Sequence, residues 1–412
     1  MRPPDGLLRD LAASLPSTTA KHLESAIGRI AGAKEQGKRV VVITGSGPNI
    51  HEGVTTLVAE LIRKGVVDGV ITSSAVVAHE MAGTLDRVWR VSGDSVRLPV
   101  PLDHLPRGRA FEITLLDNAQ RETISKEITD GWDVYDTLLG KPGQTVIKAA
   151  GNMAWPIGLR TERLAREIQS AAMQYGVSLE RFAGFGADPM TMIGAGARKG
   201  VPVVVSIPQL IGGGAVGLAI GDTWSISRRA RAIAELLSDA AVIVESAIAL
   251  TQEIHDGPFE TYTGHGIWAE WDHLSTYSLE GKTLVRIDLD PNLERAWSLE
   301  RAGSEVQNAV DQGLPKTKRT GIPFRMEMSG FARLETSIPI TADIGAAWPL
   351  IAAGLEERLG IRLDFLPAPQ ESDHGKRMRE WMTTGIRFLD PEQMYREAKR
   401  VLSAVDQRMG VV

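Results

Sequence analysis

Residues 38–57 read KRVVVITGSGPNIHEGVTTL, and the predicted fold is built outward from this stretch. Residues 40–43 form a β-branched run, which is typical of a strand buried on both faces of a sheet. Turn residues interrupt the run at 45–48, and apolar residues with helical spacing follow from Glu52. A strand, a glycine turn and a helix predict the entry to a nucleotide-binding βαβ unit. An ordinary tight connection between strand and helix gives the same local pattern, because Ile50 replaces the third glycine of G-x-G-x-x-G.

The composition favours a cytoplasmic enzyme with a substantial core. The 412 residues are 43% hydrophobic and 24% charged, with a formal net charge of −5, so nothing in the charge balance predicts nucleic-acid binding. No apolar run is long enough to cross a membrane, and the first residues lack the apolar core of a signal peptide. The chain has no cysteine, which excludes disulfides, a thiolate nucleophile and cysteine-ligated metal.

Further strand patterns predict an α/β fold with a doubly wound, mostly parallel, Rossmann-like sheet. We expect a helical lead-in over residues 1–36, the nucleotide-binding domain over 37–312, and a C-terminal extension over 313–412. Residues 90–140 break the alternation of strands and helices with a loop rich in Pro, Gly and Asp, so we expect an excursion there. The other strands are predicted at 66–72, 144–148, 201–207, 241–246 and 283–288.

Candidate cofactor-binding residues follow the ends of these strands, where ligands bind in α/β sheets. The segment from Gly212 to Gly217 matches G-x-G-x-x-G literally, although a flexible loop or close helix packing explains the same glycines. An acidic residue after the strand at 283–288 can hydrogen-bond a ribose hydroxyl. The candidates are Gly45, Ser46, Gly47, Asn49, Ser73, Ser74, Gly212, Gly213, Gly214, Glu245, Asp288 and Asp290.

Residues 252–266, QEIHDGPFETYTGHG, gather polar groups that could carry catalysis. His265, between two glycines, is the best single candidate for a base, and His255 is a second. Asp256 and Glu260 could hold a cationic substrate. Surface histidines and a solvated acidic loop are the alternative interpretation, and they apply equally to His51 and His79, which also fall near predicted strand ends.

Lys148 ends a predicted strand beside small residues, so a Schiff-base role is conceivable. A lysine that extends from a strand end into solvent is the alternative. No H-x-x-x-H or H-E-x-x-H spacing occurs, so we expect no metal site.

Three segments resemble the deoxyhypusine-synthase-like NAD-binding superfamily, and most closely the C-terminal LOR/SDH-type domain of archaeal and cyanobacterial ornithine cyclodeaminases. Residues 41–85 resemble that family's first strand, Gly-Pro turn with a following histidine, helix and second strand with a downstream histidine. Residues 283–304 are similar to its final strand and turn, and 252–266 resemble the loop that lines the NAD and amine pocket of deoxyhypusine synthase. The resemblance covers about 35–95 and 180–305. No lysine matches the catalytic lysine of the synthase.

The resemblance implies NAD as cofactor, a homo-oligomer (tetramer or dimer), and a basic amino acid or polyamine as substrate. The implied reaction is transient oxidation at an amine carbon, as in a cyclodeaminase, lyase or aminoalkyl transferase. Two alternatives stay open: an enzyme of the same fold that uses NAD for hydration or dehydrogenation, and a nucleotide-sensing protein without catalysis. A sensor would need the nucleotide site but not the polar groups of residues 252–266.

Overall fold

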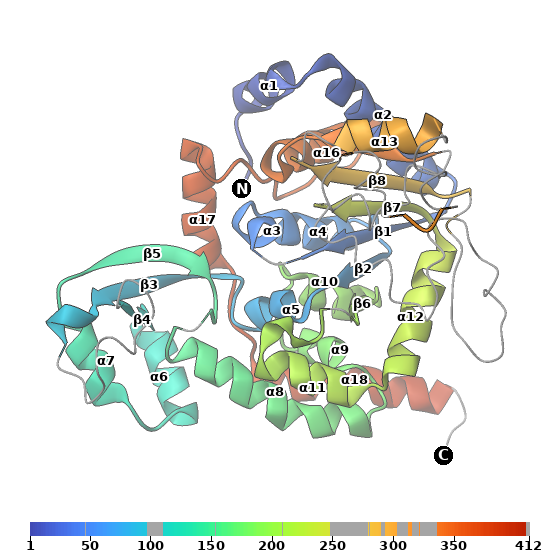
Figure 1. The fold of residues 1–412 in the computed structure, drawn as a ribbon. Coiled ribbons are helices and arrows are strands. Elements are labelled where there is room, and N and C mark those ends of the chain that lie inside the picture. The colour runs from blue at the N-terminus through green and yellow to red at the C-terminus, as the bar shows by residue number, and fades with distance from the viewer. Residues whose placement is uncertain are drawn as a thin grey trace.

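A sheet of six parallel strands forms the centre of the molecule (Figure 1). The computed structural model describes residues 1–45, 47–96, 110–152, 154–207, 209–247, 279, 281–289, 293–302, 312–314, 321 and 336–408. The strand order is β6-β2-β1-β7-β8-β9. The strands are β1 (Arg39–Thr44), β2 (Gly69–Thr72), β6 (Val203–Val205), β7 (Ala240–Ser246), β8 (Thr283–Asp288) and β9 (Ile338–Thr341).

This strand order identifies a doubly wound α/β fold. Numbered along the chain among themselves, the six strands lie in the order 3-2-1-4-5-6, which is the order of dinucleotide-binding sheets. The predicted fold class is therefore confirmed. The winding reverses between β1 and β7, and ligands of such sheets bind beyond the carboxyl ends of the strands at that reversal.

Alternate residues of β1 pack into separate clusters on the two faces of the sheet. Val40 and Val42 belong to the large core cluster, whereas Val41 and Ile43 contact the helix on the other face. That helix is α12 (Ile226–Asp239), and its Leu236 lies so close to β2 that a Cβ added to Gly69 would meet Leu236 Cδ1 at 2.3 Å. The large cluster takes in α2 (Ser17–Glu35), α4 (Val54–Arg63), α5 (Ser74–Met81), α8 (Ile157–Gln174), α9 (Leu179–Gly184), α10 (Met192–Lys199), α11 (Ala215–Thr223) and α16 (Ile344–Leu359).

A second, antiparallel sheet occupies much of the predicted excursion. Its order is β4-β3-β5, with β3 (Leu85–Ser92), β4 (Ala110–Thr114) and β5 (Gly143–Ala149). The interpretation of 144–148 as a strand of the parallel sheet was therefore wrong, whereas the excursion expected at 90–140 contains β4 and two helices. Antiparallel strands alternate between a buried and an exposed face. Here Val91 and Ile113 pack on Tyr135 and Leu138 of α7 (Trp132–Leu139), which follows α6 (Asn118–Glu127) and the short η1 (Gly93–Ser95).

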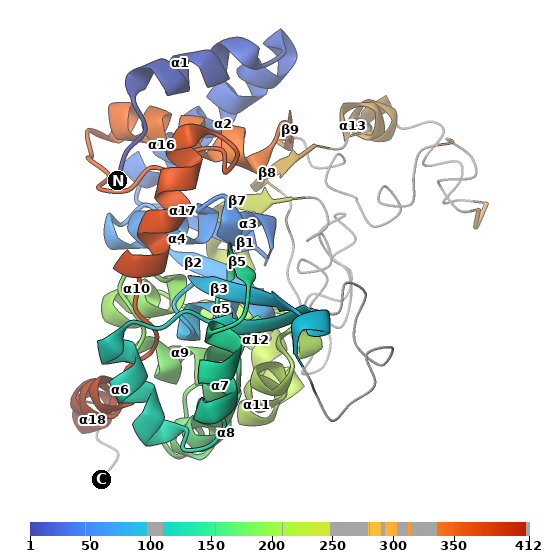
Figure 2. The same cartoon turned by 90° about the vertical axis from the view of Figure 1, so that its left-hand side faces the viewer.

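The C-terminal residues add to both sheets. Strand β9 hydrogen-bonds β8 in parallel, and α16 packs on α2 of the N-terminal lead-in, which begins with α1 (Asp5–Ser14). Helix α17 (Asp373–Gly385) contacts β3 and β5, and α18 (Pro391–Arg408) contacts α9. In the view of Figure 2, α17 runs down the near side of the molecule, from the level of α16 to that of α10. Helix α13 (Leu293–Ala302) contacts β9. The predicted domain boundaries stay a prediction.

Within the described ranges, no helix combines the length and the apolar character that a membrane span requires.

Candidate functional site

The turn after β1 begins the candidate site. Gly47 adopts φ +58°, a conformation that residues with a Cβ rarely take, and it caps α3 (Pro48–His51). Apart from its chain neighbours, no atom of the described residues lies within 4 Å of the place where its Cβ would be, so this part of the chain leaves room for a ligand at the Gly47 backbone. The apolar helix predicted from Glu52 is α4, which begins at Val54 because Gly53 before it takes the left-handed conformation. Pro48 has no N–H to offer an anion.

Asn49 ties this turn to the end of β7. Its amide Nδ2 donates to the Ser246 carbonyl at 3.3 Å, and Ser246 Oγ donates to Asn49 Oδ1 at 2.5 Å. Trp348 Nε1 donates to the same Oγ at 2.8 Å. All three side chains are buried, so these hydrogen bonds fix Asn49 to the end of β7, at the reversal between β1 and β7.

Three hydroxyl groups lie unpaired at the carboxyl ends of the neighbouring strands β1, β2 and β6. Thr44, Thr72 and Ser206 are fully buried, and their hydroxyl oxygens have no hydrogen-bond partner in the described part of the chain. Buried hydroxyls are nearly always hydrogen-bonded, so these three lack, among the described residues, the partner that such a group usually has. Sequence reasoning did not single out these three residues.

The serines and glycines predicted for the cofactor form a packed connection on the same side. Ser73 caps α5 through the Val76 amide. Ser74 Oγ donates to the Gln209 carbonyl at 2.7 Å and accepts from the Gly213 amide at 2.8 Å. A Cβ on Gly213 would meet Ser74 carbonyl atoms at 2.7 Å. Gly212 and Gly213 lie in η3 (Ile211–Gly213), and Gly214 caps α11. Close packing therefore accounts for Gly213, as the alternative interpretation held.

Glu245 and Asp288 lie at the ends of β7 and β8. Glu245 forms an ion pair with Arg286 across the two strands, and both side chains are fully buried. Asp288 is buried at the end of β8, two strands from β1 and thus roughly 10 Å away across the sheet. Their cofactor role stays a prediction. Of the other candidates, Ser46, His255, Asp256, Glu260, His265 and Asp290 lie outside the described residues, and Gly45 is buried after β1.

Five ionisable side chains meet where the two sheets and α17 approach one another, beside the β1 turn. In Figure 1, α3 and α5 lie between the parallel and the antiparallel sheet. We call this group the polar junction; its members are His51 of α3, His79 of α5, Asp86 of β3, Lys148 of β5 and Arg379 of α17. The charges of Arg379, His79 and Lys148 all act on His51, and that of Lys148 acts on His79 and Asp86.

The two histidines of the polar junction are neutral at physiological pH and have opposite tautomers. Burial, aided by the charge of Arg379, lowers the pKa of His51 to about 4. Its Nδ1 accepts from Arg379 Nη2 at 3.1 Å, so its proton is on Nε2. Burial also lowers the pKa of His79, whose Nδ1 donates to the Ala150 carbonyl at 2.7 Å. Nε2 of His79 therefore carries a lone pair that can accept a proton.

Asp86 is a second proton acceptor in the polar junction. Burial raises its pKa to about 6, although a hydrogen bond from Thr114 and the charge of Lys148 favour the ionised form. Thr114 Oγ1 donates to Oδ2 at 3.0 Å, and Oδ1 has no partner among the described residues. Sequence reasoning missed Asp86 because it missed the strand β3. A polar residue within that strand is the only sequence feature that could have pointed to Asp86.

Lys148, predicted as a Schiff-base candidate, forms an ion pair. Its Nζ donates to Glu112 Oε2 at 2.6 Å, and Arg90 pairs with the other carboxylate oxygen. Burial opposes ionisation of Glu112, but hydrogen bonds from Lys148 and Arg90 outweigh it and lower the pKa of that carboxyl. The arrangement places Lys148 as a fixed positive charge, and the Schiff-base role stays a prediction.

Arg379 is the cation of the polar junction whose hydrogen bonds go to neutral acceptors. Its Nη2 donates to the Ile147 carbonyl at 2.7 Å and to His51, both neutral acceptors. In the ranges that the structure describes it forms no ion pair, and its buried Nε has no partner. Burial lowers its pKa from the ordinary value, although the negative charges of Glu52 and Glu380 act to raise it. A guanidinium in this state is suited to bind a carboxylate.

The described residues contain no group of three or more His, Asp or Glu placed to hold a metal ion.

Comparisons with known proteins give distant likenesses in structure and none in sequence. No known family model matches the chain, and no curated protein matches it. The apo structure of ArgZ, an arginine dihydrolase from the ornithine-ammonia cycle in cyanobacteria, is 13% identical with a TM-score of 0.40, over 84% of this chain and 32% of that one. The ternary complex of AgrE with ornithine and NAD+ is 15% identical with a TM-score of 0.40, over 83% of this chain and 34% of that one. A conserved LOR/SDH protein from Methanococcus maripaludis S2 is 12% identical with a TM-score of 0.37, over 87% and 70%.

The chain thus spans about a third of the length of ArgZ and AgrE. The fold assignment rests on the strand order itself.

Proposed function

We propose that this chain is an NAD-dependent enzyme that acts on a basic amino acid by transient oxidation at the carbon bearing an amine. A cyclodeaminase or lyase reaction is the form that we favour, with aminoalkyl transfer as the variant. The observation that carries the proposal is the position of the polar junction, which adjoins the open glycine turn at the reversal of a 3-2-1-4-5-6 sheet.

The residues at the carboxyl edge fit a dinucleotide. Gly47 leaves its backbone open, and the unpaired hydroxyls of Thr44, Thr72 and Ser206 offer hydrogen bonds to phosphate or ribose oxygens. Bound NAD would supply the redox chemistry at the amine carbon. The protein's own part is to hold the substrate, exclude water and move protons.

Arg379 supports an amino acid over a polyamine as substrate. A polyamine carries positive charges only and would meet repulsion from Arg379 and from Lys148. The carboxylate of an amino acid could form a direct ion pair with Arg379, which has none among the described residues, and could accept from its Nε.

His79 is suited to take the proton that leaves when an amine carbon is oxidised. Its Nε2 is the basic atom, and the Ala150 carbonyl fixes the ring in that tautomer. Asp86 can exchange a proton near neutral pH because its pKa is about 6. A nucleotide sensor would need neither group, so these two side chains favour an enzyme. Hydration or dehydrogenation in the same site is the second candidate reaction, since both would use the same base.

The first test of the proposal measures the NAD that is bound to the purified chain. The purified chain is denatured, and released NAD is quantified by mass spectrometry and absorbance. The Gly47→Ala variant is expected to release much less NAD than the wild type, because the Cβ strains the turn and covers the exposed backbone. Gly37→Ala is the matched control: Gly37 has φ +68° and an equally open surrounding, but it precedes β1 at the opposite end of the strand.

About one NAD for each wild-type chain, retained in Gly37→Ala and lost in Gly47→Ala, would support the proposal. Absence of NAD from the wild type, with no thermal stabilisation by added NAD, would refute it. If NAD binds, turnover of ornithine, lysine and arginine then separates the enzyme from a sensor.

A further inference from the structure

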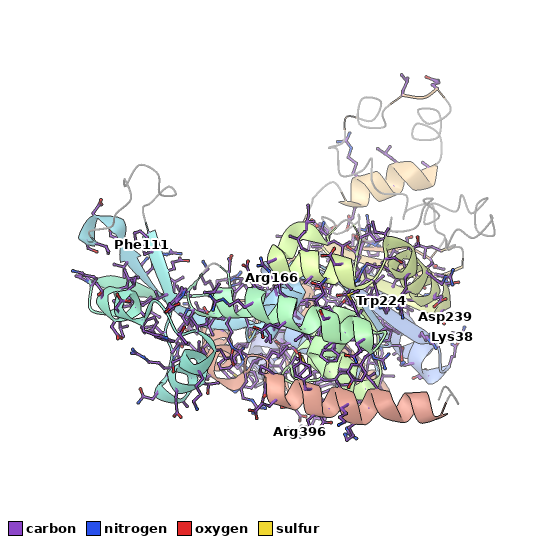
Figure 3. All side chains as sticks on the ribbon, turned by 90° about the horizontal axis from the view of Figure 1, so that it is seen from below. Lys38, Phe111, Arg166, Trp224, Asp239 and Arg396 are labelled. Atoms are coloured by element: carbon purple, nitrogen blue, oxygen red, sulfur yellow. The ribbon has the colours of Figure 1, made fainter. Side chains whose placement is uncertain are left out.

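A cavity of about 310 Å³ lies along the free edge of β6, apart from the polar junction. The residues before α9, the end of α10, the start of β6 and the start of α12 form its walls. It therefore opens at the amino end of the sheet. In Figure 3, Trp224 lies toward Lys38, which precedes β1, and far from Phe111 of the antiparallel sheet. The residues used below are Val177, Glu180, Arg181, Ile193, Trp224 and Arg228.

The inner wall of the cavity carries a buried acceptor that lacks a donor. Glu180 is 1% exposed, and its Oε1 accepts from the Val205 amide at 3.1 Å and from Arg229 Nη1 at 2.5 Å. Its Oε2 has no partner within the described chain, and the same holds for the buried Nε1 of Trp224. Buried polar atoms without partners are rare and costly. A ligand that offers a donor to Glu180 would remove that cost.

The outer part of the cavity is positively charged. Arg181 and Arg228 are exposed, and neither forms an ion pair with any described residue. Arg228 is held in place, since its Nη2 donates to the Gly176 carbonyl at 2.7 Å and its guanidinium lies 4.5 Å from the centre of the Trp224 ring. Glu180 is already neutralised by the buried Arg229. The remaining charge therefore favours an anion at the opening.

Apolar side chains line the space between these two ends. Val177 and Ile193 lie on its walls, together with valines of β6. The volume is at the small end of the range for ligand sites, roughly 300–1,000 Å³. An elongated molecule of a few carbon atoms fits better than a nucleotide.

We propose that this cavity is a second binding site, which takes a small aliphatic carboxylate with a hydrogen-bond donor at its far end. The carboxylate pairs with Arg181 and Arg228, the chain contacts the apolar walls, and the donor reaches Glu180 Oε2. The site stands apart from the proposed NAD-dependent reaction and does not depend on it.

Three probes separate these contributions by isothermal titration calorimetry on the full chain. The probes are ω-hydroxyhexanoate, which has both groups, hexanoate, which lacks the donor, and hexanol, which lacks the carboxylate. ω-Hydroxyhexanoate is expected to bind saturably, and each of the other two at least about tenfold more weakly, because each loses a hydrogen bond to a charged group.

Variants at the opening locate the site. The double variant Arg181→Gln with Arg228→Gln is expected to weaken ω-hydroxyhexanoate binding about tenfold or more. Arg231→Gln, an exposed change on the same helix, is the control and should bind as the wild type does. Glu180→Gln should abolish the preference for ω-hydroxyhexanoate over hexanoate; if that variant does not fold, the wild-type comparison of the two probes still decides the point.

Absence of saturable binding by ω-hydroxyhexanoate would overturn the proposal. So would equal binding of hexanol, or unchanged affinity in the double variant.

Discussion

Glu80 gives the sharpest test of the physical reasoning, because its effect on stability depends on pH in a defined direction. Its side chain is fully buried, and its two oxygens accept from the amides of Met192 at 2.8 Å and Ile193 at 3.0 Å. It therefore joins α5 to the start of α10. Burial raises its pKa from 4.5 to about 7, although the two hydrogen bonds favour the ionised form.

The sign follows from proton linkage. The folded chain binds the Glu80 proton more tightly than the unfolded chain does, so protonation stabilises the fold. That contribution is fully present below the unfolded pKa of 4.5 and is lost as the pH rises through about 7. From these two pKa values, the free energy of unfolding should fall by about 2.5 kcal/mol between pH 5 and pH 8 through this one group.

Glu80→Gln removes the titration while keeping the size of the side chain. The variant is expected to be less stable overall, because its NH2 group places a donor against one of the two backbone amide donors while its carbonyl oxygen accepts from the other. Its stability should nevertheless lack the fall of about 2.5 kcal/mol that Glu80 causes in the wild type. Urea unfolding at the two pH values, followed by tryptophan fluorescence, measures the difference. Other titrating groups contribute equally to both proteins and cancel.

Glu122→Gln serves as control, because that side chain is 75% exposed in α6. It should keep the wild-type dependence on pH. If Glu80→Gln shows the same loss of stability from pH 5 to pH 8 as the wild type, the assignment of a raised pKa to burial of Glu80 is refuted.

Three further predictions concern the polar junction. Arg379→Gln should weaken ornithine binding by about tenfold or more in calorimetry, with circular dichroism to confirm folding, and should not weaken the binding of putrescine, which lacks the carboxylate and is repelled by Arg379; equal losses for both ligands would contradict the carboxylate role. His79→Gln should lower turnover of the accepted amino acid by roughly two orders of magnitude while NAD release stays at the wild-type level, and unimpaired turnover would exclude His79 as the base. Asp86→Asn should remove an inflection near pH 6 from the pH–rate profile, because the burial-raised pKa of Asp86 is about 6; an inflection that persists would have another origin.

Five strands of the parallel sheet could be predicted because they are short β-branched runs followed by small residues, whereas β9 was not predicted. β1 and β7 are the clearest examples, and both begin and end close to the predicted positions. The antiparallel sheet was missed because β3, LDRVWRVS, alternates apolar residues with two arginines and looked like the start of a loop. Its pairing with β5 depends on contacts more than fifty residues apart, which local pattern does not record.

The candidate site, like the fold, could be predicted only in part from the sequence. The glycine turn and the two histidines could be located, since each follows a predicted strand or lies in the next helix. Arg379 could not, because it reaches His51 from 328 residues further along the chain. Nor could the unpaired hydroxyls of Thr44, Thr72 and Ser206, since threonine and serine are common at strand ends and only the packed structure shows that they lack partners.

The buried pair of Glu180 and Arg229 also bears on how the chain avoids association. β6 is an outer strand of the parallel sheet, and an outer strand with free N–H and C=O groups is a template on which another chain can add. Glu180 takes the Val205 N–H, and Arg229 takes the Val205 C=O at 3.0 Å, so two side chains occupy the positions that a neighbouring strand would use. The pair thus blocks the outer edge of β6 against the addition of a further strand. Loss of either member would expose a strand edge to aggregation as well as weaken the core.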